Sequence, residues 1–154
     1  MASGRPLSVE RVSGKPNIHN YTTTSATLAF YKGDLVRLDT SGTLVIATDV
    51  DATNAQGILG IAMSADPEST STNVPVDVIT SDGSTFVMKS TDTTAVAYNG
   101  CYHAITLTAG AHTVAAGAGH FVQLGLWDAA GATKARIVGT FAPSVLQAEI
   151  GVAA

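Results

Sequence analysis

The sequence predicts an all-β protein, a small β-barrel or sandwich with an extended N-terminal arm. Short apolar runs rich in Val, Ile, Leu and Thr are separated by turns of Gly, Asp, Ser and Pro, which is typical of sheet proteins. No segment keeps a helical period for longer than two turns. The 154 residues suit a single domain. We therefore divide the chain into an arm, residues 1–25, and a β-domain, residues 26–154.

The arm mixes Gly and Pro with isolated apolar residues, and its three basic residues against Glu10 leave a net charge of +2. So few apolar residues cannot build a core, and we expect the segment to order only on a partner. Plain solvation of the basic residues is the alternative. If residues 1–25 form such an arm, removal of residues 1–20 should leave the fold intact. The residues predicted to contact the partner are Arg5, Leu7, Val9, Arg11, Val12, Lys15 and Ile18.

The first half of the β-domain contains strands and hairpin turns. Turns are predicted at Ser41-Gly42 and Asp82-Gly83. Gly60, inside a strand, indicates a bulge or a close backbone approach, and Pro75 indicates an edge strand or a strand start. The predicted strands are 26–31, 34–39, 43–48, 58–63, 74–79 and 84–89.

The second half predicts strands at 103–108, 121–127 and 135–141, whereas residues 144–150 fit either a short helix or a last strand. Phe121 and Trp127 are six residues apart and would share one face of a regular strand. Core packing accounts for both rings, but Trp127 at a strand end would also suit a subunit contact. We therefore keep Phe121 and Trp127 as candidates for an oligomer interface.

The composition argues for a binding surface. Only 13% of the residues are charged, and Thr, Ser, Ala and Gly must cover much of the exterior. Desolvating hydroxyls and methyls costs far less than desolvating unpaired charges, so such an exterior tolerates large permanent contacts. A Thr-rich exterior also suits an ordinary β-protein. The net charge of −4 argues against nucleic-acid binding. No apolar run is long enough for a signal or a membrane span, which predicts a cytoplasmic origin.

Candidate catalytic and metal-binding residues are sparse. The four His residues are scattered without acidic neighbours at ligand spacing, which predicts no metal site. Asp49, Asp51 and Asn54 resemble the beginning of a calcium loop. The twelfth position of such a loop needs a carboxylate, but this sequence has Gly60 there, so a solvated turn explains these residues better. No nucleophile elbow or phosphate loop is present. We expect no cofactor and no enzymatic activity, with a hydrolase site built from distant residues as the remaining alternative. Cys101 is expected to be a small buried hydrophobe.

The segment from Gly33 to Val87 resembles the capsid decoration, or cement, proteins of tailed bacteriophages. The resemblance covers roughly the middle third of the chain. It is carried by Lys-Gly-Asp-Leu-Val-Arg-Leu-Asp at 32–39, Gly-Thr-Leu-Val-Ile-Ala at 42–47, Gly-Ile-Leu-Gly-Ile-Ala at 57–62 and Val-Asp-Val at 76–78.

The resemblance implies a structural virion protein. Such proteins are β-domains, commonly trimeric, that sit on the outer surface of the expanded head and clamp major capsid protein subunits, often through an N-terminal arm. The expected partners are therefore the major capsid protein and further copies of this chain, without nucleic acid or membrane. The alternative is a carbohydrate-binding or receptor-binding β-module of a virion, for which exposed aromatic side chains would be the distinguishing feature.

Overall fold

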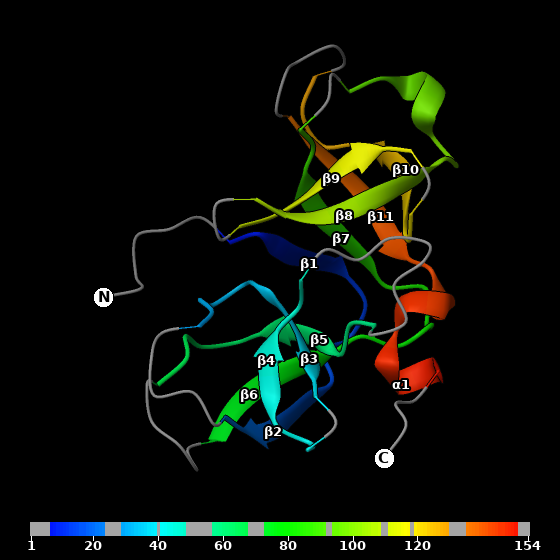
Figure 1. Cartoon of the computed structure of the whole chain (residues 1–154). Coiled ribbons are helices and arrows are strands. Elements are labelled where there is room, and N and C mark those ends of the chain that lie inside the picture. Colours follow the sequence, from blue (N-terminus) through cyan, green and yellow to red (C-terminus); the bar gives the residue numbers. More distant parts are fainter. Residues whose placement is uncertain are drawn as a thin grey trace.

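A computed structural model describes residues 7–23, 29–39, 41–48, 57–67, 73–91, 94–108, 111–117, 119–129 and 135–150. Within these residues the chain forms two antiparallel sheets and one short helix. The two sheets pack against each other in a sandwich-like arrangement, with β1 lying between them in the view of Figure 1. The all-β prediction is confirmed, and its sandwich form is observed instead of a closed barrel.

The larger sheet, sheet A, has six strands in the order β1-β7-β11-β10-β8-β9. A parallel bridge between Ser90 and Val114 brings β9 back towards the end of β7, so the sheet is strongly curled. Its strands are β1 (Val9–Ser13), β7 (Thr85–Lys89), β8 (Tyr102–Thr108), β9 (Ala111–Ala116), β10 (Phe121–Leu126) and β11 (Arg136–Phe141).

The smaller sheet, sheet B, has five strands in the order β2-β6-β5-β3-β4. A parallel bridge from Thr23 to Leu44 links the end of β2 to β4, so this sheet also curls on itself. Its strands are β2 (Ile18–Thr22), β3 (Leu35–Leu38), β4 (Leu44–Ile46), β5 (Gly60–Ala62) and β6 (Asn73–Val78).

Two apolar cores hold the fold together. The larger core lies between the sheets and includes Leu35 and Ile61 from sheet B with Phe86 and Phe121 from sheet A. The second core fills the curl of sheet B and includes Val36, the residue next to Leu35. The edge strand β2 is largely exposed. Successive residues of a strand point to opposite faces, so the inner part of sheet B is buried on both faces. This explains why its strands are continuous apolar runs without clean alternation.

The predicted arm is wrong for residues 7–23, because these residues belong to the two sheets. β1 pairs with β7, and β2 pairs with β6. The segment lacks a core of its own, but the ladders of two existing sheets supply the partners. Arg5 lies outside the described residues.

Gly60 is a close backbone approach, which is one of the two alternatives that the sequence left open. A Cβ atom at this position would lie 2.1 Å from the carbonyl oxygen of Asp77 on the neighbouring strand. Pro75 does not mark an edge, since β6 lies between β2 and β5. Its register places it opposite Met63, one residue beyond β5, and the Met63 amide donates to the Pro75 carbonyl over 2.9 Å. The missing proline N–H therefore falls where this ladder ends.

Two further expectations differ from the structure, and one open alternative is decided by it. Residues 29–31 are not in a strand, and Phe30 instead fills the core of sheet B; residues 26–28 lie outside the described part. The strand β9 was not predicted, because its Ala-rich sequence carries a weak signal. Residues 143–150 form a 3₁₀ turn (Pro143–Val145) and the helix α1 (Gln147–Ile150), which selects the helical alternative.

Candidate protein-interaction surface

A buried polar cluster joins the two sheets near the start of β1. The Ser8 hydroxyl donates to Asp34 over 2.9 Å and accepts a hydrogen bond from the His112 backbone amide. The Leu35 amide donates to Nδ1 of His112, so Nδ1 carries no proton, and Nε2 donates to the Ala47 carbonyl over 2.7 Å. His112 is therefore neutral, with both ring nitrogens hydrogen-bonded, and the Ser8 hydroxyl donates to a carboxylate. These contacts stabilise the fold, and the two side chains do not form a pair of nucleophile and base.

Arg11 forms the second polar connection between the sheets. Its guanidinium, on β1, donates from Nε and Nη2 to the two carboxylate oxygens of Asp77 on β6, each over 2.8 Å. Nη1 donates to the Ser84 hydroxyl, and the charged group lies 5.0 Å from the centre of the Phe86 ring. Both charged side chains are almost fully buried. Arg11 is therefore a structural residue, which contradicts its predicted contact with a partner.

The other predicted arm residues divide into two groups. Val9 is 1% exposed and packs in the core between the sheets, so it cannot contact a partner. Leu7, Val12 and Ile18 are exposed, and so is Lys15. Val12 is an extra residue in β1, where the register shifts between Arg11 and Ser13. Its side chain is exposed to solvent at this bulge.

A second bulge separates the two predicted interface rings. In β10, Gln123 pairs with Gly139, but Gly125 pairs with Val138, so one extra residue is inserted and the inside-outside alternation reverses. Phe121 before the bulge is fully buried, whereas Trp127 after it is 51% exposed. The expectation that Phe121 and Trp127 share a face is therefore wrong. Phe121 is a core residue, and Trp127 alone stays an interface candidate.

The outer face of sheet A carries an apolar strip formed by Tyr102, Val122, Leu124, Trp127 and Val138. Tyr102 pairs directly with Val122, while the next pair along, His103 with Phe121, points into the core. Tyr102 and Leu124 are 53% and 50% exposed, and Val122 and Val138 are half-buried. Exposed aromatic and large aliphatic side chains on one face are typical of protein-binding surfaces. Single-strand periodicity did not reveal this strip, since a bulge has no clear sequence signal.

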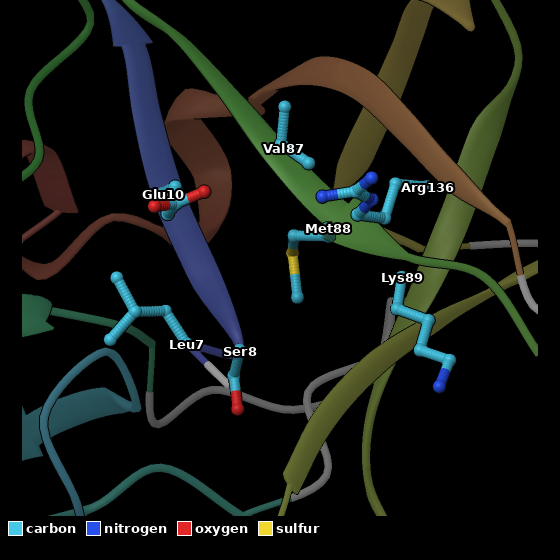
Figure 2. A pocket seen from close by; sticks show the side chains of 7 residues that line it. All are labelled: Leu7, Ser8, Glu10, Val87, Met88, Lys89 and Arg136. Carbon is cyan, nitrogen blue, oxygen red and sulfur yellow. The ribbon is translucent and has the colours of Figure 1, made fainter. Parts of the chain in front are cut away.

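The strip leads into a pocket at the β1 edge of the same face. Val138 pairs with Val87, and Val87 pairs with Glu10, which stands on the pocket rim. The pocket has a volume of about 490 Å³, and Figure 2 shows the side chains around it, from β1 and the two residues before it, β7 and β11. Its lining residues are Leu7, Ser8, Glu10, Val87, Met88, Lys89 and Arg136.

Arg136 is tied to a loop carboxylate. It donates from Nε and Nη2 to the two carboxylate oxygens of Asp128, each over 3.1 Å, and from its backbone amide over 2.8 Å. These hydrogen bonds lower the pKa of Asp128 and raise the pKa of Arg136. Glu10 also contributes to the raised pKa of Arg136 through its negative charge. Both groups therefore stay ionised at neutral pH.

Cys101 is exposed, which contradicts the expected buried position. It lies in the turn between Tyr98 and β8, with its thiol 4.0 Å from the Ala97 carbonyl. The apolar residues near Cys101 in the sequence are the inward-facing residues of β8, and the inward-facing positions begin at His103.

The described part of the chain contains no group of three His, Cys, Asp or Glu side chains that could hold a metal ion. His103 and His120 are buried neighbours, since the His120 amide donates to the His103 carbonyl over 3.1 Å, but their rings contact different groups, the Cys101 carbonyl and the Ser144 hydroxyl. His112 is buried elsewhere, and His19 is exposed next to Asn17. Asp49, Asp51 and Asn54, the possible calcium loop, lie outside the described residues.

Comparison with known proteins identifies no relative. No family model matches the sequence, and neither the curated proteins nor the solved structures that were compared contain a match. Among the residues that the structure describes, no helix has the length and apolar character needed to cross a membrane.

Proposed function

We propose that this chain is a structural virion protein, a capsid decoration (cement) protein of a tailed bacteriophage. It would bind the outer surface of the expanded head and bridge major capsid protein subunits. The observation that carries the proposal is the apolar strip on sheet A, which leaves Tyr102, Leu124 and Trp127 about half exposed on a chain with few charges. The resemblance of the middle third to decoration proteins supplies the partner.

The physical role would be stabilisation by mass action. A ligand that binds only the assembled, expanded shell lowers the free energy of that shell relative to its subunits. A homotrimer would present three strips at once, and simultaneous engagement would raise the overall affinity well above that of one copy. The protein would be made in the host cytoplasm and act on the outer capsid surface, without a cofactor or an enzymatic reaction.

The location of the strip favours a binding role over a packing role. Tyr and Trp are enriched among the residues that dominate the binding energy of protein interfaces, because each ring buries a large apolar area. The strip sits on a six-stranded sheet whose other face is anchored in the core, so the surface is held rigid before a partner arrives. Leu7, Val12 and Ile18 are further exposed apolar residues that could extend the contact.

The test is the molecular mass in solution, by light scattering, followed by sedimentation with purified expanded phage capsids. We expect a trimer that co-sediments with capsids and binds them weakly after the double change Leu124→Ser and Trp127→Ser. Met63→Ser is the matched control, because Met63 is exposed but lies at the end of β5 in the other sheet. A monomeric wild-type protein that binds none of the expanded capsids tested would refute the proposal.

A virion module that binds a carbohydrate or receptor is the second candidate, and the exposed Trp127 ring is the observation that favours it. Exposed aromatic rings stack on the apolar faces of sugars as readily as they fill protein pockets. A glycan-array signal that disappears with Trp127→Ala, together with no capsid binding, would favour this candidate over the first.

A further inference from the structure

Two positive charges face each other directly beside the pocket on sheet A. Arg136 on β11 is paired with Lys89 on β7. The Ser90 amide donates to the Ala135 carbonyl over 2.8 Å, so the adjacent Lys89 and Arg136 pair is not hydrogen-bonded. Side chains come closest in such pairs, and like charges directly opposite each other repel. The two side chains point in different directions in Figure 2.

The fold neutralises only one of these two charges. Asp128 binds Arg136 through both carboxylate oxygens. In the part of the chain that the structure describes, no carboxylate forms an ion pair with Lys89. The remaining charge of the pocket is that of Glu10, which stands on the β1 side with Val87 between it and β11. The pocket is therefore positive at its Lys89 end and negative at its Glu10 end.

Apolar atoms separate the two charged ends. Val87 and Met88, both buried, line the pocket between Glu10 and Lys89, and the partly exposed Leu7 lies on the Glu10 side (Figure 2). The volume of about 490 Å³ is enough for one or two side chains of a partner. A complementary ligand therefore needs an apolar group with a carboxylate on the Lys89 side and no negative charge on the Glu10 side.

We propose that this pocket binds an acidic segment of a protein partner, in which one Asp or Glu stands next to an apolar side chain. The carboxylate pairs with Lys89 and offsets its repulsion with Arg136, while the apolar side chain covers Leu7 and Val87. Repulsion by Glu10 sets the direction in which the segment lies. This inference deepens the proposed function, since it rests on the partner being a protein and adds the chemistry of the contact.

The experiment is an NMR titration of the isotope-labelled full chain with a blocked pentapeptide that has one Asp between Leu and Val. Two matched peptides carry Asn or Lys in place of the Asp. We expect the acidic peptide to shift the resonances of Leu7, Val87 and Lys89, with the Asn peptide at least about tenfold weaker and the Lys peptide inactive. Lys89→Glu should abolish binding, whereas Lys15→Glu, the same charge change at a lysine outside the pocket, should preserve it.

Equal binding of the three peptides, shifts away from the pocket, or full binding by Lys89→Glu would each overturn the inference. An unchanged amide spectrum of Lys89→Glu without peptide shows that the variant is folded. Sedimentation with expanded capsids is run in parallel. Peptide binding without capsid binding would refute the phage function but keep the pocket, and capsid binding that survives Lys89→Glu would refute the pocket but keep the function.

Discussion

Sheets A and B are both antiparallel, but they differ in which of their faces are buried. Apart from its edge strand β2, sheet B is buried on both faces: Leu35 and Ile61 pack towards sheet A, and Val36 and Ala62 pack into the curl of sheet B itself. Sheet A buries only its inner face and leaves an apolar strip on the outer one. Sheet B is therefore the scaffold, and sheet A is the part whose surface is available to a partner.

Among the polar contacts, the largest effect is expected at the charged contact between the sheets. Asp77→Ala would leave the Arg11 guanidinium buried without its carboxylate, which costs about 3–5 kcal/mol of the free energy of unfolding. Urea unfolding measures this loss. The double variant Arg11→Met with Asp77→Leu should recover much of the stability, because no buried charge is left unpaired. Loss of less than about 1 kcal/mol in Asp77→Ala would show that the two sheets do not depend on this contact.

Two glycines, one in each sheet, test the scaffold against the surface. Gly60→Ala in β5 would place a methyl group 2.1 Å from the Asp77 carbonyl oxygen, and backbone must move. We expect a destabilisation of about 1–3 kcal/mol or more. Gly125→Ala in β10 is the matched change, since no heavy atom lies within 4 Å of the new methyl group, and its effect should be small. Similar losses in both variants, by thermal unfolding, would contradict the close backbone approach at Gly60.

The strip should tolerate polar changes that the core cannot. Leu124→Ser removes a side chain that is 50% exposed, so the free energy of unfolding should change by about 0.5 kcal/mol or less. The same replacement at Ile61, which is buried between the sheets, should cost several kcal/mol. Chemical denaturation of both variants gives the comparison. Strong destabilisation by Leu124→Ser would mean that the strip belongs to the fold.

A modest, pH-dependent effect is expected in the turn after β3. The Asp39 carboxylate accepts hydrogen bonds from the Thr43 amide, the Thr43 hydroxyl and the Ser41 amide. These bonds, the Thr43 amide first, lower the pKa of Asp39 from its ordinary 3.8. A lowered folded-state pKa gives stability that is complete above 3.8 and is lost as the pH falls through the lower folded value.

Asp39→Ala should therefore cost about 1 kcal/mol at pH 7, reduced by the exposure of the turn. The difference between variant and wild type should shrink as the pH falls below about 4. Urea unfolding at pH 7 and pH 3 measures both values. A difference that stays the same at both pH values would show that the ionised carboxylate does not stabilise the turn.

The N-terminal segment also changes the design of truncations. Removing residues 1–20 would delete β1 with the Arg11 contact and most of β2. We expect that variant to unfold, instead of folding without partner binding as the sequence suggested. A folded and cooperative truncated chain would contradict the register observed for β1 and β7.

The sequence by itself determined the all-β class, most strands of the β-domain and the choice at Gly60 between a bulge and a close backbone approach. These follow from local properties: apolar runs, Gly and Pro positions, and the absence of a helical period. Tertiary structure alone decided the rest. In the sequence, residues 9–22 have no visible packing partner, whereas in the fold they pair with β7 and β6. The sequence also suggests that Arg11 is solvated, whereas the fold places Asp77 opposite it. The exposure of Trp127 depends on one inserted residue in β10, because a single bulge exchanges the inner and outer faces of all that follows.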